Sequence, residues 1–483
     1  MPTDKNKLIT EFSKALTDKT AAVFIGAGLS VPAGFVKWTE LFKDVAIDLG
    51  LDIEEEKHDL ISLVQYYFNK KRNRGTIDQL LEDKYGNRAA SPIENHKILA
   101  RLPIQYFWTT NYDKLIENAL IESGKTPDVK KSINNLSIVT RKRDAIIYKM
   151  HGDIDSPHNA VITKDDYEIY PKKNELFSIA LRGDLVSKTF LFLGFSFEDP
   201  NLNYILSRIR ILLDGHTKEH YCIFKRVNKK DFKSNEQFIR TEIKQNLRVE
   251  DLKRYGIQTI LIDDYPEITN ILSEIEYCYR LSTIFISGSA HEYNPWGKIK
   301  SLNFIRNLSK EISSNNYKIV SGFGKGIGAE VVNGTLDYIF STNYRHIEDY
   351  LLLRPFPHLI SDPDERKFKW SKYRKEMISS SGISLFIFGN KLIKDDKGTA
   401  QVIQADGMRE EYEISKENKN KLIPIGITGY ISEEFWNEVM NNFNTLYQNH
   451  PQLKTEFQEL NNKSLEPDRL IEIIIKIILE IKK

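Results

Sequence analysis

An amide, a carboxylate and an imidazole follow two apolar stretches in the first third of the sequence. Asn111 and Asp113 stand in "TTNYDKL", and His151 stands in "KMHGDI". An imidazole exchanges protons near neutral pH, and an amide can position a sugar hydroxyl or a water, so the pair could perform acid–base chemistry. Each residue alone also fits a structural role: Asn or Asp before a helix is commonly a cap, and a lone His is commonly a hydrogen-bonding partner.

A glycine turn precedes these residues, in the stretch "VFIGAGLSVPAG". Glycines that follow a strand allow a phosphate to approach backbone N–H groups and the start of a helix. The turn lacks the third glycine of the dinucleotide fingerprint, where Val31 stands, and it lacks the Lys-Ser/Thr pair of a P-loop. A tight turn without any ligand therefore remains an alternative.

The elements that must position these residues are strands. Apolar runs over 21–28, 104–113, 145–154 and 189–199 each end in one of the polar or glycine-rich clusters, the last containing Gly194 and Ser196. Further strands are expected over 219–227 and 257–264, with helices between them. Open α/β sheets place ligands at the carboxyl ends of their strands, so this half predicts a doubly wound α/β domain with one ligand edge.

A second strand followed by a glycine turn begins near residue 282, in "STIFISGSA", which contains Gly288 and Ser289. Seeing this opening twice predicts two Rossmann-like domains, 1–280 and 281–483. A later stretch, "VSGFGKGIGAE", alternates glycines that include Gly324 and Gly326 before a helix. Such a run can form an anion-binding nest, although a flexible loop also fits.

Four charged residues of the second half suit a nucleotide. Arg374 precedes the expected strand 383–389 and Lys391 follows it. The cationic side chains of these two residues would suit a pyrophosphate, and the carboxylate of Glu410 or Glu411 would suit ribose hydroxyls. The sequence does not separate Glu410 from Glu411 as the inward acid. Solvated surface charges are the alternative for all four.

Bulk composition narrows the function classes. The 483 residues carry 69 Lys and Arg against 67 Asp and Glu, a net charge of +2 that gives no reason to propose nucleic-acid or anionic-membrane binding. No apolar window is long enough for a membrane span, and Cys222 and Cys278 lack the spacing of a zinc site, so a cytoplasmic chain without metal is expected. The closing stretch "RLIEIIIKIILEIKK" would form a helix that is apolar around most of its circumference. We expect this helix to pack on two sides, and a second subunit could supply one of them.

The order of the first-half motifs resembles the sirtuin catalytic core, over about residues 10–260. Sirtuins bind NAD and break the bond between nicotinamide and ribose, and the resemblance implies that Asn111 holds the nicotinamide ribose and a water while His151 accepts a proton. The other NAD-contacting residues that it implies are Gly26, Ala27, Gly28, Ser30, Asp113, Gly194 and Ser196. The four zinc-binding cysteines of protein-deacylating sirtuins are missing, so water is the expected acceptor and the expected reaction is hydrolysis of NAD+ without a metal.

The second half is similar to the SLOG fold over about residues 282–430. The glycine loop of its catalytic members is largely replaced by "QADGMREE", so ligand binding rather than hydrolysis is expected there. The ligand residues implied are Gly288, Ser289, Gly324, Gly326, Arg374, Lys391, Glu410 and Glu411.

Both halves together resemble the NAD-hydrolysing effector family of the bacterial Thoeris anti-phage system. That resemblance implies a homotetramer or larger assembly that destroys NAD+ when a cyclic ADP-ribose isomer, made by a TIR-domain partner, binds the SLOG domain. Which isomer acts, and whether NADP is cut, are not given by the sequence. A sirtuin-like protein deacylase and a non-catalytic nucleotide sensor remain as alternatives.

Overall fold

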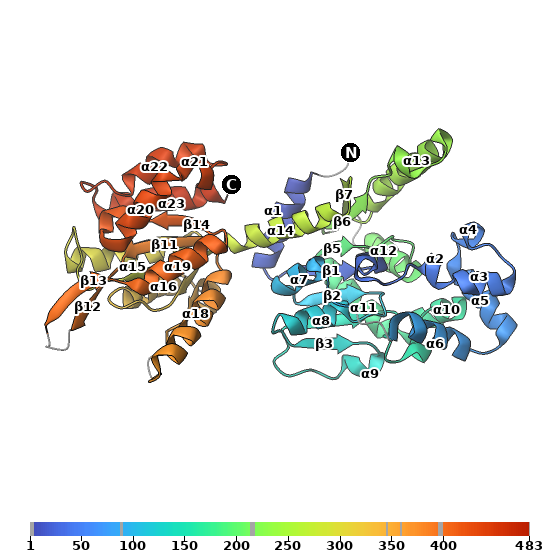
Figure 1. Cartoon of the computed structure of the whole chain (residues 1–483). Coiled ribbons are helices and arrows are strands. Elements are labelled where there is room, and N and C mark those ends of the chain that lie inside the picture. Colours follow the sequence, from blue (N-terminus) through green and yellow to red (C-terminus); the bar gives the residue numbers. More distant parts are fainter. Residues whose placement is uncertain are drawn as a thin grey trace. The chain divides into compact units, whose positions relative to one another are not determined.

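The chain forms two compact units, residues 1–276 and 277–483. The computed structural model describes residues 4–86, 90–212, 218–343, 346–357, 360–394 and 399–482. The division falls inside helix α14 (Pro266–Arg280), near the predicted boundary between residues 280 and 281. Each unit is built around its own parallel sheet, as Figure 1 shows.

The first unit has a seven-stranded parallel sheet in the order β3-β4-β2-β1-β5-β6-β7. Its strands are β1 (Ala21–Ile25), β2 (Tyr106–Thr109), β3 (Pro127–Lys130), β4 (Ala145–Lys149), β5 (Thr189–Leu193), β6 (His220–Lys225) and β7 (Ile257–Ile262). All six predicted strands are present, and the edge strand β3 is additional. The sheet is doubly wound because the chain leaves β1 first to one side and later to the other.

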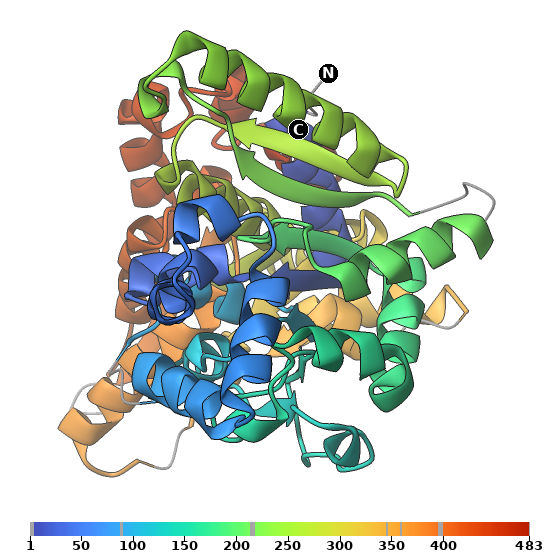
Figure 2. The ribbon, with the colours of Figure 1, turned by 90° about the vertical axis from the view of Figure 1, so that its right-hand side faces the viewer.

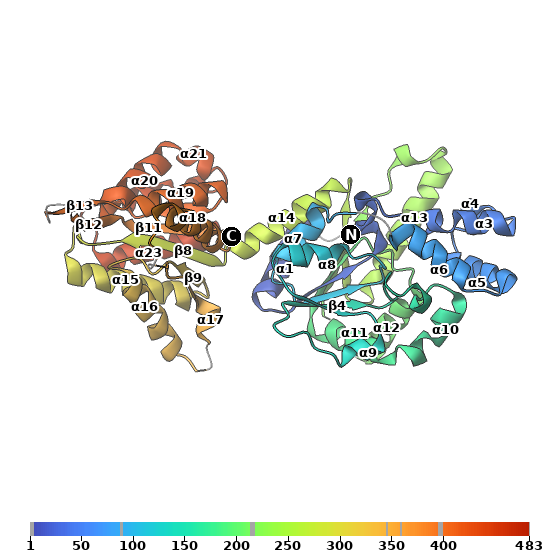
Figure 3. The same ribbon diagram turned by 60° about the horizontal axis from the view of Figure 1, so that its bottom comes forward.

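Helices cover both faces of this sheet. They are α1 (Lys5–Thr17), α2 (Trp38–Leu41), α3 (Lys43–Leu49), α4 (Ile53–Glu56), α5 (Leu60–Lys71), α6 (Gly75–Leu81), α7 (Glu94–Arg101), α8 (Leu115–Glu122), α9 (Ile133–Leu136), α10 (Lys164–Lys173), α11 (Glu175–Ser187), α12 (Pro200–Leu212), α13 (Asn235–Lys253) and α14. Figure 3 shows α7 and α8 on one side of the sheet and α11 and α12 on the other. Phe24 packs with Phe177 and Leu181 of α11, while Val23, which points the opposite way in the pleat, is also fully buried.

The helices α2 to α6 are inserted between β1 and β2. Their core, which includes Leu41, Phe42 and Leu63, packs against Tyr112 and Ile162, which come after the carboxyl ends of β2 and β4. The insertion therefore covers part of the edge at which the predicted site lies. At the β7 end of the strand order, α13 packs along this edge strand (Figure 2).

The second unit has a five-stranded parallel sheet in the order β10-β9-β8-β11-β14, plus the hairpin β12-β13. The strands are β8 (Thr283–Ser289), β9 (Lys318–Ser321), β10 (Leu351–Leu353), β11 (Ile383–Phe388), β12 (Asn390–Lys394), β13 (Ala400–Gln404) and β14 (Lys421–Pro424). The helices are α15 (Lys298–Ser314), α16 (Gly328–Phe340), α17 (Ile347–Tyr350), α18 (Pro363–Ser379), α19 (Asp406–Glu417), α20 (Tyr430–Asn441), α21 (Phe443–Leu446), α22 (Lys454–Glu459) and α23 (Pro467–Ile481). The prediction of two Rossmann-like α/β domains is confirmed.

The closing helix α23 packs against α15 and α22 of its own unit. Leu470, Ile474, Ile477 and Ile478 are each fully buried there, as the isoleucine-rich sequence predicted. Two packed sides are therefore supplied from within the unit, while Leu479 of the same helix is 41% exposed, and the contact with a second subunit stays a prediction.

Candidate active site and second polar site

The predicted catalytic residues follow two neighbouring strands in matching register. Strands β2 and β4 pair in parallel with Thr109 opposite Lys149, so Asn111 and His151 each lie two residues beyond that pair. The strand order β4-β2-β1-β5 places their loops beside the point where the winding of the sheet reverses. Ligands of doubly wound sheets bind at this point.

Asn111 is held by a chain of hydrogen bonds. Its Nδ2 donates to Oγ of Ser30 at 3.0 Å, and that hydroxyl donates to Oδ2 of Asp113 at 2.8 Å. Asn111 is only 7% exposed, and within the described part of the chain its Oδ1 has no hydrogen-bond partner. Because the amide nitrogen is already used, the side chain offers its oxygen as a fixed acceptor. A buried acceptor without a partner costs about 1–3 kcal/mol, as expected where a ligand or water completes the site.

Lys149 ties the Asn111 loop to the strand that carries His151. Its buried Nζ donates to the backbone oxygens of Tyr112 at 3.2 Å and Asp113 at 2.5 Å. The same ammonium contacts Oε1 of Glu117 at 3.0 Å and Oδ2 of Asp153 at 2.5 Å. Although burial alone would lower its pKa, these carboxylates raise it, so Lys149 is charged.

His151 is 1% exposed, and its Nε2 lies 3.1 Å from Oδ2 of Asp199. Neither ring nitrogen has a hydrogen bond of good geometry within the described residues, so this approach is an electrostatic contact. Tyr167 and Tyr170 of α10 flank the ring edge-on, with centroids 5.3 and 6.2 Å away. Burial would raise the pKa of Asp199, but His151 and the backbone N–H groups of Leu202 and Asn201 lower it below its ordinary value.

The glycines of the first turn have a structural reason that the sequence did not show. A Cβ on Gly26 would lie 2.4 Å from the carbonyl oxygen of Gly194, and one on Gly28 would lie 2.9 Å from the same atom. The N–H of Gly28 donates to Gly194 O at 2.9 Å, and that of Gly26 donates to Leu193 O. Gly194 itself has a φ of +64°, which favours glycine. The turns after β1 and β5 therefore lie backbone against backbone, and the roles of Gly26, Ala27, Gly28 and Gly194 in NAD binding stay predictions.

A cavity of about 340 Å³ reaches this hydrogen-bonded group. Asp113 and Lys114 stand in its wall with Phe35 and Tyr85 of the inserted region. Ser196, in contrast, is exposed, and its backbone oxygen accepts a hydrogen bond from Arg248. A small ligand in the cavity would touch Asp113, which connects through Ser30 to Asn111.

The predicted ligand glycines of the second unit also pack against one another. A Cβ on Gly324 would lie 1.9 Å from Gly288 O, and one on Gly326 would lie 1.9 Å from Ala290 O. Ser289 donates through Oγ to the backbone oxygen of Asn390 at 3.1 Å. The turns after β8 and β9 are thus brought together at one edge of the second sheet.

Arg374 on α18 is paired with both candidate acids of α19. Its Nε lies 3.2 Å from Oε1 of Glu411, and its Nη1 lies 2.6 Å from Oε2 of Glu410. Glu411 is buried and accepts from Oγ of Ser287 at 2.6 Å, whereas the side chain of Glu410 is 36% exposed. Glu411 is therefore the inward acid, and burial raises its pKa against the opposing effect of Arg374. Lys391 lies apart from this group, 2.8 Å from Asp406, where it is more exposed.

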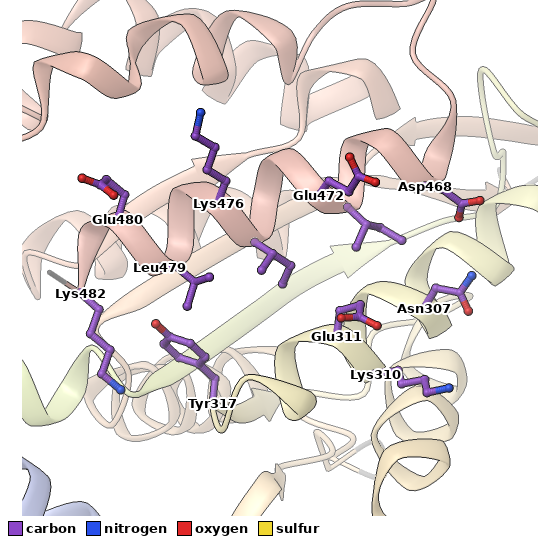
Figure 4. A pocket seen from close by; sticks show the side chains of 12 residues that line it. Asn307, Lys310, Glu311, Tyr317, Asp468, Glu472, Lys476, Leu479, Glu480 and Lys482 are labelled. Carbon is purple, nitrogen blue, oxygen red and sulfur yellow. The ribbon is translucent and has the colours of Figure 1, made fainter. Parts of the chain in front are cut away.

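The groove between α15 and α23 holds a cavity of about 1100 Å³ in the second unit. Figure 4 shows Leu479 facing Tyr317 across it, with Glu311 and Glu472 along its rims. None of the predicted ligand residues lines it.

Two features are absent from the described residues, a metal-binding cluster and a membrane-spanning helix. Within those ranges no three His, Cys, Asp or Glu side chains gather as a metal ion would require. None of the helices in the same ranges combines the length and apolar character that a membrane crossing requires.

Each of the two units matches a known protein family. Residues 105–254 match the model of the SIR2-like domain, and residues 267–481 match that of the Sir2- and TIR-associating SLOG family. A protein of Cytobacillus dafuensis named NAD(+) hydrolase ThsA is 47% identical over 99% of this chain and 97% of its own length. Proteins of the same name from Acinetobacter baumannii and Bacillus cereus are 46% and 45% identical, each covering 97% or more of both chains.

The chain belongs to the ThsA family.

ThsA membership confirms the predicted resemblance to an NAD-hydrolysing effector with sirtuin-like and SLOG domains. Sequence reasoning missed two residues of this candidate site, Asp199 and Lys149. Asp199 is the last residue of the predicted run 189–199 and received no role, although it follows β5 on the same edge as the other clusters. Lys149 carries a weaker signal, a lysine at the end of an otherwise apolar strand directly before Met150 and His151.

Proposed function

We propose that this chain hydrolyses NAD+ to ADP-ribose and nicotinamide, with Asn111 and His151 as its catalytic residues. The observation that carries the proposal is the hydrogen-bonded group Asn111–Ser30–Asp113 at the reversal point of a doubly wound sheet, with Asn111 and His151 at matching positions after the paired strands β2 and β4. The name NAD(+) hydrolase, borne by relatives that match nearly the whole chain, supports the same activity.

The reaction requires few covalent steps from the protein's own side chains. The bond between C1′ of the ribose and the pyridinium nitrogen breaks, nicotinamide leaves with the electron pair, and water adds to C1′ and releases one proton. Asn111 would hold a ribose hydroxyl or the water through its free Oδ1, and His151 would take the proton. Burial of both side chains keeps bulk water away and strengthens their polar contacts.

The second unit would control this activity. A cyclic ADP-ribose isomer, made by a TIR-domain partner, would bind where Arg374 and Glu411 meet the turns after β8 and β9. The guanidinium suits a pyrophosphate and the inward carboxylate suits ribose hydroxyls. A coupling free energy of about 1–3 kcal/mol between two such sites is typical of allosteric proteins. The matched description, which names association with Sir2 and TIR, supports this part.

In the cell, the chain would be an anti-phage defence effector that acts in the cytoplasm as a homotetramer or larger assembly. Activation would deplete NAD+ and stop growth of the infected cell.

Chromatography of the products tests the proposal. Purified full-length chain is incubated with NAD+, with and without the cyclic ADP-ribose isomers that a TIR-domain enzyme makes from NAD+. Equal amounts of nicotinamide and ADP-ribose, rising on addition of the isomers, support it. NAD+ turnover only when an acylated peptide is present would indicate a deacylase, and binding without turnover would indicate a sensor.

A further inference from the structure

We propose that Asp199 is the positioning residue of His151, holding its imidazole across the site with one oxygen while the other oxygen caps helix α12. The inference rests on the NAD+ hydrolysis proposed above and assigns that site a residue to which sequence reasoning gave no role.

The contact joins two loops whose strands are not neighbours. His151 follows β4 and Asp199 follows β5, and β2 and β1 lie between those strands. Three strand spacings separate β4 from β5, a distance of about 14 Å. Nevertheless Nε2 of His151 and Oδ2 of Asp199 are 3.1 Å apart, so both loops must reach over the ends of β2 and β1. The contact thus crosses the edge at which the glycine turn and Asn111 lie.

The side chains of His151 and Asp199 are buried, with 2% and 7% of their surface exposed, so solvent screens their interaction little. The two carboxylate oxygens are used separately. Oδ1 accepts from the backbone N–H of Leu202 at 2.9 Å, which is the capping bond of α12, and this fixes the carboxylate on the helix. Oδ2 faces the imidazole.

A carboxylate at this place would select one tautomer of His151. It favours a proton on Nε2, the nitrogen that it faces, and leaves the lone pair on Nδ1 to accept a proton from water. Nδ1 is buried and has no hydrogen-bond partner within the described residues, as a base awaiting its substrate would.

The other titratable groups around the ring do not provide this charge. Tyr167 and Tyr170 of α10 face the ring, and burial raises the pKa of both well above the ordinary value. Asp166 of the same helix is neutralised by Arg74 at 2.9 Å. Asp153, two residues after His151, is neutralised by Lys149.

The variant Asp199→Asn separates the two uses of the side chain. Asparagine is as good a cap as aspartate, so α12 keeps its hydrogen bond, while the charge facing His151 is lost. We expect nicotinamide release to fall by about tenfold or more, within the contribution of a general base.

Asp59→Asn is the matched control. Asp59 caps α5 in the same way, because its Oδ1 accepts from the backbone N–H of Ser62, three positions on, but it lies on the surface. Its rate of nicotinamide release should equal that of the unaltered chain. If Asp199→Asn releases nicotinamide as fast as Asp59→Asn, the inference is wrong although NAD+ hydrolysis stands.

A readout that needs no turnover separates the inference from the proposed function. With ¹⁵N-labelled histidine, the His151 signal is assigned by its loss in His151→Gln, and its shifts report which nitrogen carries the proton. We expect protonated Nε2 in the unaltered chain and a mixture of tautomers in Asp199→Asn. The same tautomer in both chains would overturn the inference, whereas a chain that never releases nicotinamide but shows this tautomer change would overturn only the proposed function.

Discussion

The amide nitrogen of Asn111 lies 3.0 Å from the hydroxyl oxygen of Ser30, and that hydroxyl in turn donates to Asp113. This geometry fixes which end of the Asn111 amide is available. Nδ2 is committed to the protein, and Oδ1 is left as a buried acceptor. The orientation of a single amide therefore depends on a serine 81 positions earlier in the chain.

Ser30→Ala should release this amide. Removing the hydroxyl leaves Nδ2 of Asn111 and Oδ2 of Asp113 without their shared partner, and hydrogen bonds to charged groups contribute about 1.5–3 kcal/mol. We expect NAD+ hydrolysis to fall by about tenfold or more, measured as initial nicotinamide release. Ser123→Ala is the control, since its hydroxyl donates only to Leu120 O at the end of α8. Equal rates for the two variants would contradict the orienting role of Ser30.

Lys149→Met should destabilise the first unit. The substitution removes the cation that Glu117 and Asp153 share and the donor that holds the Asn111 loop. Breaking a buried ion pair on one side costs about 3–5 kcal/mol, which corresponds to a fall of roughly 10 °C in melting temperature. Calorimetry measures this, with Lys114→Met as control because its pair with Asp155 is exposed. A melting temperature like that of the control would show that the buried network adds no stability.

Acid should destabilise the first unit through two buried histidines. Burial lowers the pKa of His220 to about 3, and burial lowers that of His96 to about 4 despite nearby Asp113. Below the ordinary value of 6.5 the unfolded chain binds protons that the folded chain refuses, so stability falls as the pH drops from 6.5 towards 4. Each imidazole contributes a slope of about 1.4 kcal/mol per pH unit in that window.

His220→Gln should reduce this slope by one proton. Glutamine can accept the hydrogen bond that Nδ1 of His220 receives from the N–H of Phe190 at 3.2 Å. Unfolding by denaturant at a series of pH values gives the slope. An unchanged slope in this variant would mean that His220 is not a neutral histidine in the folded chain.

Arg374→Gln should remove activation by the cyclic ADP-ribose isomers. The guanidinium is the cation that meets Glu411 and Glu410 in the second unit, and losing a charge-assisted contact weakens binding by about tenfold or more. Titration calorimetry with the isomers measures this on the full chain. Arg409→Gln, which alters an exposed pair of the neighbouring helix α19 with Glu434, should bind as the unaltered chain does. Equal binding by both variants would place the signal elsewhere.

Much of the site's framework was predictable because strands and their ends have strong local signals. The runs ending at Ile25, Thr109, Lys149 and Leu193 are apolar enough to identify four central strands. The register that gives Asn111 and His151 matching positions after β2 and β4 follows once those strands are neighbours. The missed strands are short or lie at edges, such as β3, which begins at Pro127 and has four residues.

The relationships that the sequence could not give are the long-range ones. The close approach of Gly26 to Gly194 depends on β1 and β5 being neighbours, a fact of topology rather than of local pattern. The same holds for Asp199, which reaches His151 from a loop 48 positions later in the chain and from a strand three places away in the sheet. Of Glu410 and Glu411, only packing against Ser287 distinguishes the inward residue.

The most direct test of the account compares the unaltered chain with Asn111→Ala and His151→Ala, each with NAD+ and the cyclic ADP-ribose isomers and without any acylated peptide. Nicotinamide and ADP-ribose are quantified over time, and circular dichroism checks that all three chains are folded. We predict equimolar products from the unaltered chain and none above background from either variant. Undiminished NAD+ hydrolysis by a folded Asn111→Ala or His151→Ala chain would contradict the claim that these two side chains carry the reaction.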